Sequence, residues 1–370
     1  MRIAFKDISR SRLRFGLLAG AVGLLFFLLL FLNTLSSALL GGFVGAIENG
    51  SSDVLVYSEE ALATIPASRL DPSLTDEVAD VEGVAAAAPI SVLTASSDIS
   101  GEVIDVAMWG VGLGEPGMPA EIEEGRLPET AGEVVMNSDA VDEGFTLGMA
   151  FELSGVELTV VGFAPDTTYS VLPTAYASAS TFADVFAAEF PEAGGFVPVN
   201  VIGVQVDDGL DAAAVAADIQ SSVAGIEAYD RAAAAEATPG VSSISQSFGL
   251  IVGITFLIVV VVVGFFFQIL TVQKLKSFAV LKAVGVGNGK LAGTITGQIA
   301  TMVIGGVAIG TLLLAGAAAA TRDTFAIDVD PVLVATAAAL VLGSSLLAGL
   351  FPIRRVVKQD PAEAAMGAGR

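Results

Sequence analysis

Four long apolar runs divide this chain of 370 residues into parts suited to lipid and parts suited to water. The first run has no charged residue between Arg14 and Glu48. The runs cover residues 15–47, 242–270, 291–320 and 331–353. Each reaches the roughly 20 apolar residues that an α-helix needs to cross a hydrocarbon core about 30 Å thick. The pattern therefore predicts four transmembrane α-helices.

The segment 48–241 has the alternating pattern of a folded α+β domain. Short runs rich in Val and Ile predict strands, at 53–58, 84–94, 102–111, 132–136, 157–163 and 199–206. Helical stretches are predicted between them, at 72–81, 180–189 and 211–223, with Asp211 as an N-cap. We expect a large α+β domain, as one body or as two lobes, inserted between the first and second transmembrane helices.

Basic residues predict the orientation, because cytoplasmic flanks of membrane helices collect Lys and Arg. They cluster in the N-terminal segment 1–14, in the loop 271–290 and in the tail 354–370. We therefore expect both termini to be cytoplasmic in a multi-pass protein of the cell (plasma) membrane. The α+β domain and the short loop 321–330 are then expected outside.

The acidic charge of the chain is concentrated in the predicted exterior domain. Residues 48–246 hold three arginines against 34 acidic residues, a net charge of −31, whereas the whole chain has −23. Such a surface disfavours binding to nucleic acid or to anionic lipid headgroups. The simplest interpretation is solubility or a salty habitat; the alternative is attraction of cationic ligands or metal.

The chain contains no Cys and no His. Disulfides, thiolate metal sites and a Cys nucleophile are therefore excluded, and so are a Ser-His-Asp triad and a His-based zinc site. We expect no catalytic residues and a chain that is not an enzyme. The basic start and the apolar core Phe15–Leu32 also fit a secretory signal, but the core is long and lacks a clear Ala-x-Ala site, which favours an uncleaved span.

The loop 271–290 (TVQKLKSFAVLKAVGVGNGK) has a helical pattern that ends in a glycine-rich stretch. It does not match a phosphate-binding loop, because Val284 stands where the first Gly belongs and Leu291 follows Lys290. A short amphipathic cytoplasmic helix that docks a partner is the favoured interpretation. A solvated connector is the alternative.

The segment KLKSFAVLKAVGVGNGKL and the tail FPIRRVVKQDPAEAAMG resemble the MacB/FtsX-type ABC transporter permeases. The exterior strings EEGRLPETAGEVVMN and GFTLGMAFELSGVELTVVGF are similar to that family's domain. The order of one span, a domain and three spans also resembles the family. RSRLRFGLLAGAVGLLFFLLLFLNTLSSAL and VVGFAPDTTYSVLPTAYAS resemble its DevC/HrtB branch, which includes haem exporters. The tail departs from the usual Leu-Arg ending at Ala365-Met366.

The resemblance implies a homodimer of permeases, each docked to a separate cytoplasmic ATPase that binds ATP and Mg. The chain itself would have no intrinsic cofactor. Its coupling helix would contact the ATPase and move spans one and two, through the residues Lys274, Leu275, Phe278, Leu281, Lys282 and Gly285. Two other functions stay open: an FtsX-like signalling subunit that controls a cell-wall enzyme, and a MacB or lipoprotein-release type of mechanotransmission subunit.

If the cargo is haem, Glu48 is the first candidate ligand, since a carboxylate is a hard donor suited to ferric iron. Phe43 and Ile47 would contact the porphyrin face. The four tyrosines and the methionines are further candidate ligands, and Glu48 could also simply end the span in the headgroup layer. Small-residue pairs could let helices approach closely within lipid or across a dimer, at Gly16/Gly20, Gly41/Gly45, Gly249/Gly253 and Gly306/Gly310.

Overall fold

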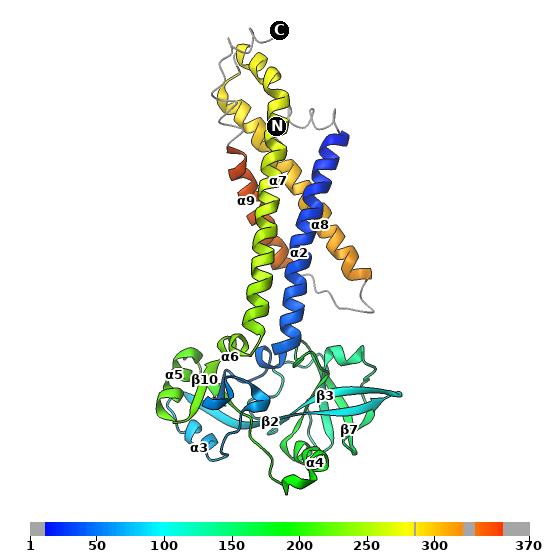
Figure 1. Cartoon of the computed structure of the whole chain (residues 1–370), viewed down its shortest axis with the longest axis vertical. Helices are drawn as coiled ribbons and strands as arrows, with labels where there is room; N and C mark the ends of the chain where they lie inside the picture. Colours follow the sequence, from blue (N-terminus) through cyan, green and yellow to red (C-terminus); the bar gives the residue numbers. More distant parts are fainter. Residues whose placement is uncertain (1–11, 285, 321–329, 351–370) are drawn as a thin grey trace. The chain divides into compact units, whose positions relative to one another are not determined.

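The computed structural model describes residues 12–284, 286–320 and 330–350. It divides the chain into a helical unit, Met1–Ser36 with Ser247–Arg370, and a domain unit, Ser37–Gln246. Four helices are long and apolar enough to cross a membrane. They are α2 (Arg12–Glu48), α7 (Val241–Ala283), α8 (Asn288–Ala320) and α9 (Pro331–Ala348) (Figure 1). The predicted fold of four apolar helices with a large α/β domain between the first two is confirmed.

Within the helical unit, α2 and α8 approach each other through glycine. A Cβ on Gly310 would lie 2.7 Å from the Gly23 carbonyl oxygen, and one on Gly306 would lie 2.6 Å from a Val22 methyl. The predicted Gly306/Gly310 pair is therefore a helix contact, as close packing in lipid requires. Gly16, Gly20, Gly249 and Gly253 have open space where a Cβ would stand, among the described residues.

Helix α7 runs without interruption from the second span through the predicted coupling segment. The sequence predicts a span ending at residue 270 and a short amphipathic helix within 271–290, whereas one helix runs through both to Ala283. Its last thirteen residues contain neither Gly nor Pro, and seven of them are Lys, Leu or Ala, which are good helix formers. The 43 residues of α7 extend about 65 Å at 1.5 Å per residue.

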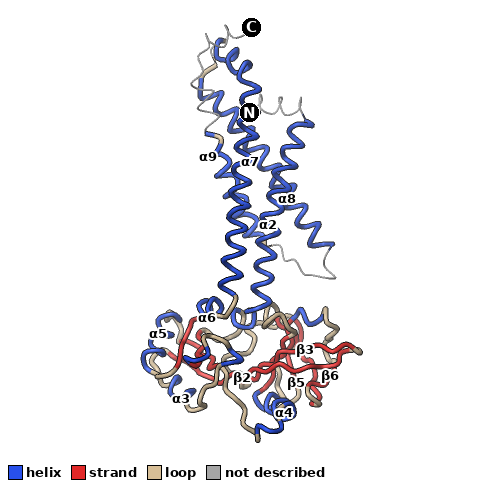
Figure 2. The backbone as a smooth tube through the Cα atoms, in the orientation of Figure 1, coloured by secondary structure: helices blue, strands red, loops and turns tan. Residues whose placement is uncertain are grey.

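The domain unit is built on a ten-stranded mixed sheet in the order β10-β1-β9-β2-β3-β8-β5-β7-β4, with β6 paired to β7. Figure 2 draws its strands in red. The strands are β1 (Val54–Ser58), β2 (Val84–Ile99), β3 (Glu102–Val111), β4 (Glu124–Gly125), β5 (Glu133–Asn137), β6 (Ala150–Leu153), β7 (Val156–Ala164), β8 (Thr174–Ser178), β9 (Val201–Val206) and β10 (Ile226–Asp230). The helices are α3 (Leu74–Ala79), α4 (Ala179–Glu189), α5 (Ala212–Ser222) and α6 (Arg231–Ala237), and the 3₁₀ turns are η1 (Glu59–Ala61), η2 (Ile65–Ala67), η3 (Ser138–Val141) and η4 (Pro191–Ala193).

The long strand β2 joins two lobes. Its first half pairs with β9 and its second half with β3. The first lobe contains β10, β1 and β9 with α3 and α5, and the second contains β3, β8, β5, β7, β6, β4 and α4. Each lobe has its own apolar core. The two-lobe alternative is therefore the one the structure supports.

Each of the six predicted strands and three predicted helices of the domain corresponds to an element of the structure. The pattern missed four further strands. Asp211 is the N-cap of α5, where its side chain accepts a hydrogen bond from the Ala213 N–H at 3.3 Å. The missed strands are β4, β6, β8 and β10. They are two to five residues long. Runs this short give a weak periodicity signal, and among the strands of five residues or fewer the pattern identified β1 and β5.

A third core, the junction core, contains the last turns of α2 together with α6. It includes Val44, Ala46, Ile47, Tyr57, Trp109, Tyr169, Tyr176, Ala234 and Ala235. The fourth tyrosine, Tyr229, packs against it, so this core gathers every tyrosine of the chain and its one tryptophan. The apolar run at 15–47 therefore contributes both to a membrane span and to the junction core of the domain. The 37 residues of α2 extend about 55 Å, whereas a hydrocarbon core is about 30 Å thick.

Candidate functional site

The three predicted haem-contacting residues lie at the end of α2. Glu48 is the last residue of the helix and is exposed. Ile47 is 2% exposed within the junction core, and Phe43 is half-buried against that core. In this conformation Glu48 lies at the surface, while Ile47 packs inside the protein. The ligand assignment of all three stays a prediction.

Three of the four tyrosines are poor candidates for binding ferric iron in this conformation. Tyr57 and Tyr176 are fully buried and Tyr169 nearly so. Burial raises the pKa of Tyr169 to about 12 and the pKa values of Tyr57 and Tyr176 further still. Phenols held neutral by desolvation are weak ligands, and the Tyr176 hydroxyl already donates to the Thr167 carbonyl at 2.8 Å. Glu48 is therefore the more accessible donor.

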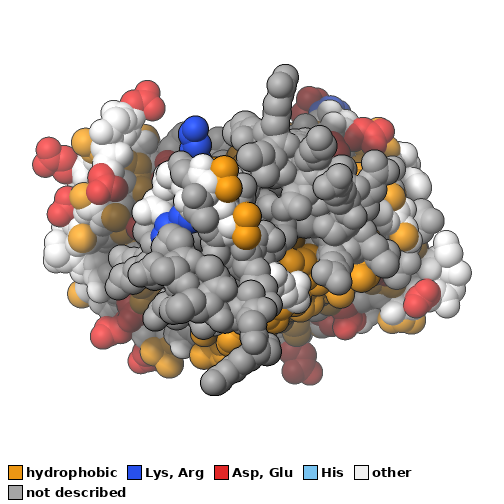
Figure 3. Space-filling view, turned by 90° about the horizontal axis from the view of Figure 1, so that it is seen from above, with side chains coloured by type: hydrophobic (Ala, Val, Ile, Leu, Met, Phe, Trp, Pro, Cys, Tyr) orange, Lys and Arg blue, Asp and Glu red, His pale blue; other side chains and the backbone are white. Residues whose placement is uncertain are grey.

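The described residues contain no group of three or more acidic side chains that could hold a metal ion. Acidic side chains (red) recur around the outline of Figure 3, and basic ones (blue) are sparse. The three arginines of residues 48–246 are all engaged. Arg126 pairs with Glu133, Arg231 pairs with Asp53, and Arg69 donates to the carbonyls of Pro66 and Ser68.

Both chain connections of the domain unit are tied together at Asp53. The segment after α2 is held by hydrogen bonds from the Ser51 N–H to the Met118 carbonyl at 2.8 Å and from the Ala120 N–H to the Asn49 carbonyl at 3.0 Å. At the start of α6, Arg231 donates to the Ser52 carbonyl at 3.0 Å and to the Asp53 carboxylate at 3.1 Å. The entry and the exit of the domain are therefore hydrogen-bonded to each other.

The predicted ATPase-contacting residues lie at the end of α7 and beyond. The backbone of Lys274, Leu275, Phe278 and Leu281 is helical, but their side chains are outside the described part, and so is Gly285 altogether. Lys282 is half-buried. Val280 and Val284, which the sequence analysis did not single out, are 63% and 79% exposed. Their spacing of four residues is the signal that could have identified them, since it places both on one helix face.

Comparison with known proteins covers both parts of the chain. The MacB-like periplasmic core domain family matches residues 16–222, and the FtsX-like permease C-terminal family matches residues 249–361. The first match alone spans more than half of the chain.

Relatives of similar length carry permease names. An uncharacterized ABC transporter permease of Mycobacterium tuberculosis is 24% identical over 98% of both chains. A protein of Staphylococcus epidermidis named as the hemin transport system permease HrtB is 22% identical over 99% of both chains. Among solved structures, the periplasmic region of MacB from Actinobacillus actinomycetemcomitans aligns with 55% of this chain and 95% of its own length, at 12% identity and a TM-score of 0.37.

Proposed function

The chain belongs to the family of ABC transporter permeases with a MacB-like periplasmic core domain and an FtsX-like C-terminal region, and from this premise we propose that it is the membrane subunit of an exporter of a lipophilic cargo. The family implies a partner ATPase subunit and a multi-pass membrane protein with a large exterior domain. The chain itself contributes no catalytic residue to the proposal: ATP and Mg are bound by the partner. Both termini and the end of α7 face the cytoplasm in this proposal, as the basic clusters predict.

Docking of the ATPase is assigned to the end of α7. Val280 and Val284 expose apolar surface beside Lys282, and an apolar pair on a helix end suits a groove in a partner protein. Because α7 is continuous to Ala283, displacement of this end would pass directly into the second span.

The proposed cargo is haem, and the proposed assembly is a homodimer. Support for haem comes from the relatives named for hemin transport and from the exposed Glu48 carboxylate at the end of α2. Two copies of Glu48 across a dimer axis would supply two oxygen donors to ferric iron. Entry from the outer leaflet suits four helices per chain, which are too few to enclose an aqueous pore. The single observation that carries the proposal is the family match across both parts of the chain.

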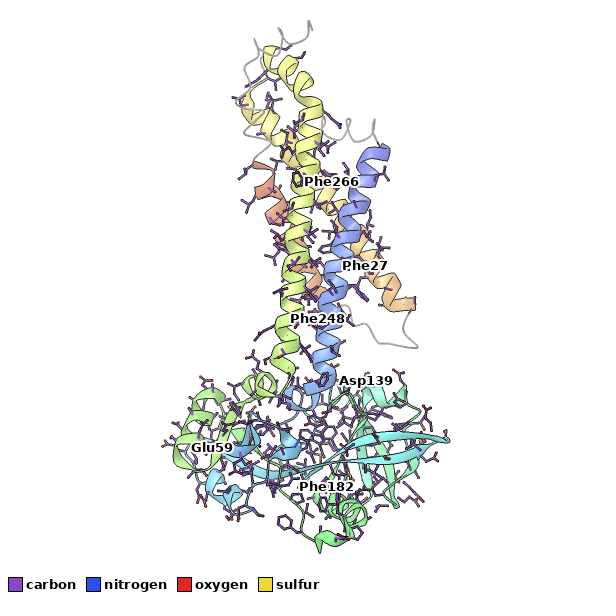
Figure 4. All side chains as sticks on the ribbon, in the orientation of Figure 1. Phe27, Glu59, Asp139, Phe182, Phe248 and Phe266 are labelled. Carbon is purple, nitrogen blue, oxygen red and sulfur yellow. The ribbon has the colours of Figure 1, made fainter. Side chains whose placement is uncertain are left out.

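Haem titration of the purified permease–ATPase complex tests the cargo. We expect Glu48→Ala to weaken haem binding at least tenfold and to shift its Soret band, because an axial ligand is lost. Glu59→Ala is the matched control, since Glu59 is an exposed carboxylate of the domain outside the end of α2 (Figure 4). A Glu48→Ala complex with unchanged spectrum and affinity would remove Glu48 from the site.

Deletion of the gene distinguishes the proposed exporter from the other two functions. Haem sensitivity of the deletion strain is the expected result. Defective septation or lysis would instead favour an FtsX-like control of a cell-wall enzyme, and lipoprotein retention without haem sensitivity would favour mechanotransmission to an outer partner.

A further inference from the structure

The two lobes of the domain are attached to the apolar helices in different ways. Helix α2 leads through Asp53 into β1, and β10 leads through α6 into α7. Both covalent routes therefore enter the first lobe. The second lobe is joined to the first by two chain segments, β2 and residues 190–200 between α4 and β9. Movement of the membrane helices must reach it through these segments or through non-covalent contacts.

One loop of the second lobe binds the end of α2 directly. We call residues Asp166–Leu172 the coupling loop. Its Ser170 and Val171 N–H groups donate to the carbonyls of Phe43 and Gly42, at 3.2 and 2.7 Å. In the reverse direction, the Ala46 N–H donates to the Thr168 carbonyl at 3.0 Å, and the Asn49 side chain donates to the Asp166 carbonyl at 2.7 Å.

Gly45 allows this approach. A Cβ at Gly45 would lie 2.4 Å from the Asp166 carbonyl oxygen and 3.1 Å from that of Thr168. Both obstacles are backbone atoms, so a side chain at position 45 requires the loop to move away. At Gly41, one turn earlier on the same helix, a Cβ would meet nothing within 4 Å.

The coupling loop is held in a costly conformation and is anchored to its own lobe. Asp166, Ser170 and Val171 have φ of 52°, 53° and 60°, values that side chains rarely adopt and that persist only where surrounding contacts impose them.

Buried hydrogen bonds impose this conformation from the sheet side. Thr168 accepts from the Asn137 amide and donates to the Asp139 carboxylate, both at 2.8 Å. The Thr174 hydroxyl accepts from the Tyr169 N–H at 2.9 Å. The loop thus joins α2 to β5 and β8 through a continuous set of contacts.

We propose that the coupling loop carries movement of the first span into the second lobe, and that Gly45 is the positioning residue that keeps loop and helix engaged. The inference rests on the proposed function, because ATP-driven movement of α2 is its source. It assigns the second lobe an active part in the export cycle.

Amide hydrogen exchange in the purified permease tests the contact without nucleotide or cargo. We expect Gly45→Ala to accelerate exchange at Ser170 and Val171 at least tenfold, with Gly41→Ala unchanged from wild type. Asn49→Ala removes the side-chain hydrogen bond to the Asp166 carbonyl, and a second one to the Gly45 carbonyl, without a clash. It is expected to accelerate exchange less, and it replaces Gly45→Ala if that variant does not fold. Protection unchanged in both Gly45→Ala and Asn49→Ala would overturn the contact.

Movement is tested in the complex with the ATPase, using dyes at Val103→Cys in the second lobe and Leu210→Cys in the first. Both positions are exposed, and the chain has no other cysteine. Single-molecule energy transfer should change with nucleotide in wild type and Gly41→Ala. In Gly45→Ala the change should be lost while ATPase activity stays within twofold.

The coupling role would be refuted if Gly45→Ala accelerates exchange in the loop but leaves the nucleotide-dependent change in energy transfer intact. It would also be refuted if energy transfer in the wild type does not change with nucleotide. Haem-stimulated ATPase activity of the wild-type complex reports separately on the proposed function. If haem does not stimulate the wild-type ATPase activity, the proposed function fails. If haem does stimulate it but the lobes do not respond as described, only the coupling role fails.

Discussion

A single ion pair organises the exposed loop before β5. Arg126 donates to both carboxylate oxygens of Glu133, at 2.8 and 2.6 Å, and the Glu129 N–H donates to the same carboxylate at 2.8 Å. These hydrogen bonds hold the pKa of Glu133 well below its ordinary value of 4.5, the Arg126 side chain being the largest cause. The motif EEGRLPETAGEV therefore forms a clamped turn at the surface of the second lobe.

This clamp predicts a pH-dependent contribution to stability. A depressed folded-state pKa stabilises the fold above the ordinary value, and that stabilisation is lost as the pH falls toward the folded value. Thermal unfolding of Glu133→Gln should therefore show a smaller loss of melting temperature between about pH 5 and pH 3 than wild type. Glu143→Gln, an exposed carboxylate elsewhere in the same lobe, is the control, and equal slopes for wild type and Glu133→Gln would contradict the prediction.

The sequence could identify Glu48 and the EEGRLP motif as notable but could not show their partners. The Arg126–Glu133 pair spans seven positions within a loop, where no periodicity predicts proximity. Likewise, the contact of Gly45 with Asp166 joins residues more than a hundred positions apart. Sequence spacing predicts neighbours only along one helix or strand.

At the scale of elements, the contact between α2 and α8 depends on Gly310. Its hypothetical Cβ would meet the Gly23 carbonyl oxygen at 2.7 Å and the Phe27 nitrogen at 2.9 Å, which are rigid backbone atoms. Gly310→Ala should thus destabilise the helical unit by about 1–3 kcal/mol, as overpacking typically does. Gly316→Ala meets open space in the same helix and should be neutral or slightly stabilising. Thermal unfolding in detergent compares them, and equal melting temperatures would refute the close packing.

The continuity of α7 predicts a second effect at this scale. Val272 lies inside the helix and is 44% exposed, so proline there breaks the helix between span and coupling segment without removing a core side chain. Proline in a helix interior costs about 3 kcal/mol. We expect the Val272→Pro complex to lose most of its haem-stimulated ATPase activity while the variant still binds the ATPase. Val272→Ala is the control and should behave as wild type. Haem stimulation that persists in Val272→Pro would argue against transmission along the helix.

The elements themselves differ in how far the sequence predicts them. The four apolar helices follow from length and composition, because an uninterrupted apolar run of this length can pair its own backbone groups in lipid only as a helix, whereas the strands of a membrane barrel alternate apolar and polar residues. The pairing of β3 with β8 in parallel, between residues such as Trp109 and Tyr176, does not follow from either strand, since both are buried and read only as apolar.

For the whole molecule, the proposed orientation can be tested by labelling, because the chain has no native cysteine. Glu59→Cys in the domain and Lys290→Cys at the start of α8 are both exposed positions. A membrane-impermeant maleimide applied to intact cells should label Glu59→Cys fully and Lys290→Cys only after the membrane is opened. The opposite pattern would place the acidic domain in the cytosol and exclude the exporter proposed above.

Because Val44, Ala46 and Ile47 belong to the junction core, the exterior domain is not separable at the point where the first charge appears. A recombinant fragment starting at Glu48 would lack these residues, would expose the apolar surface of the junction core that they cover, and would be prone to aggregate. A water-soluble version of the domain has to retain the last two turns of α2, starting near Gly41.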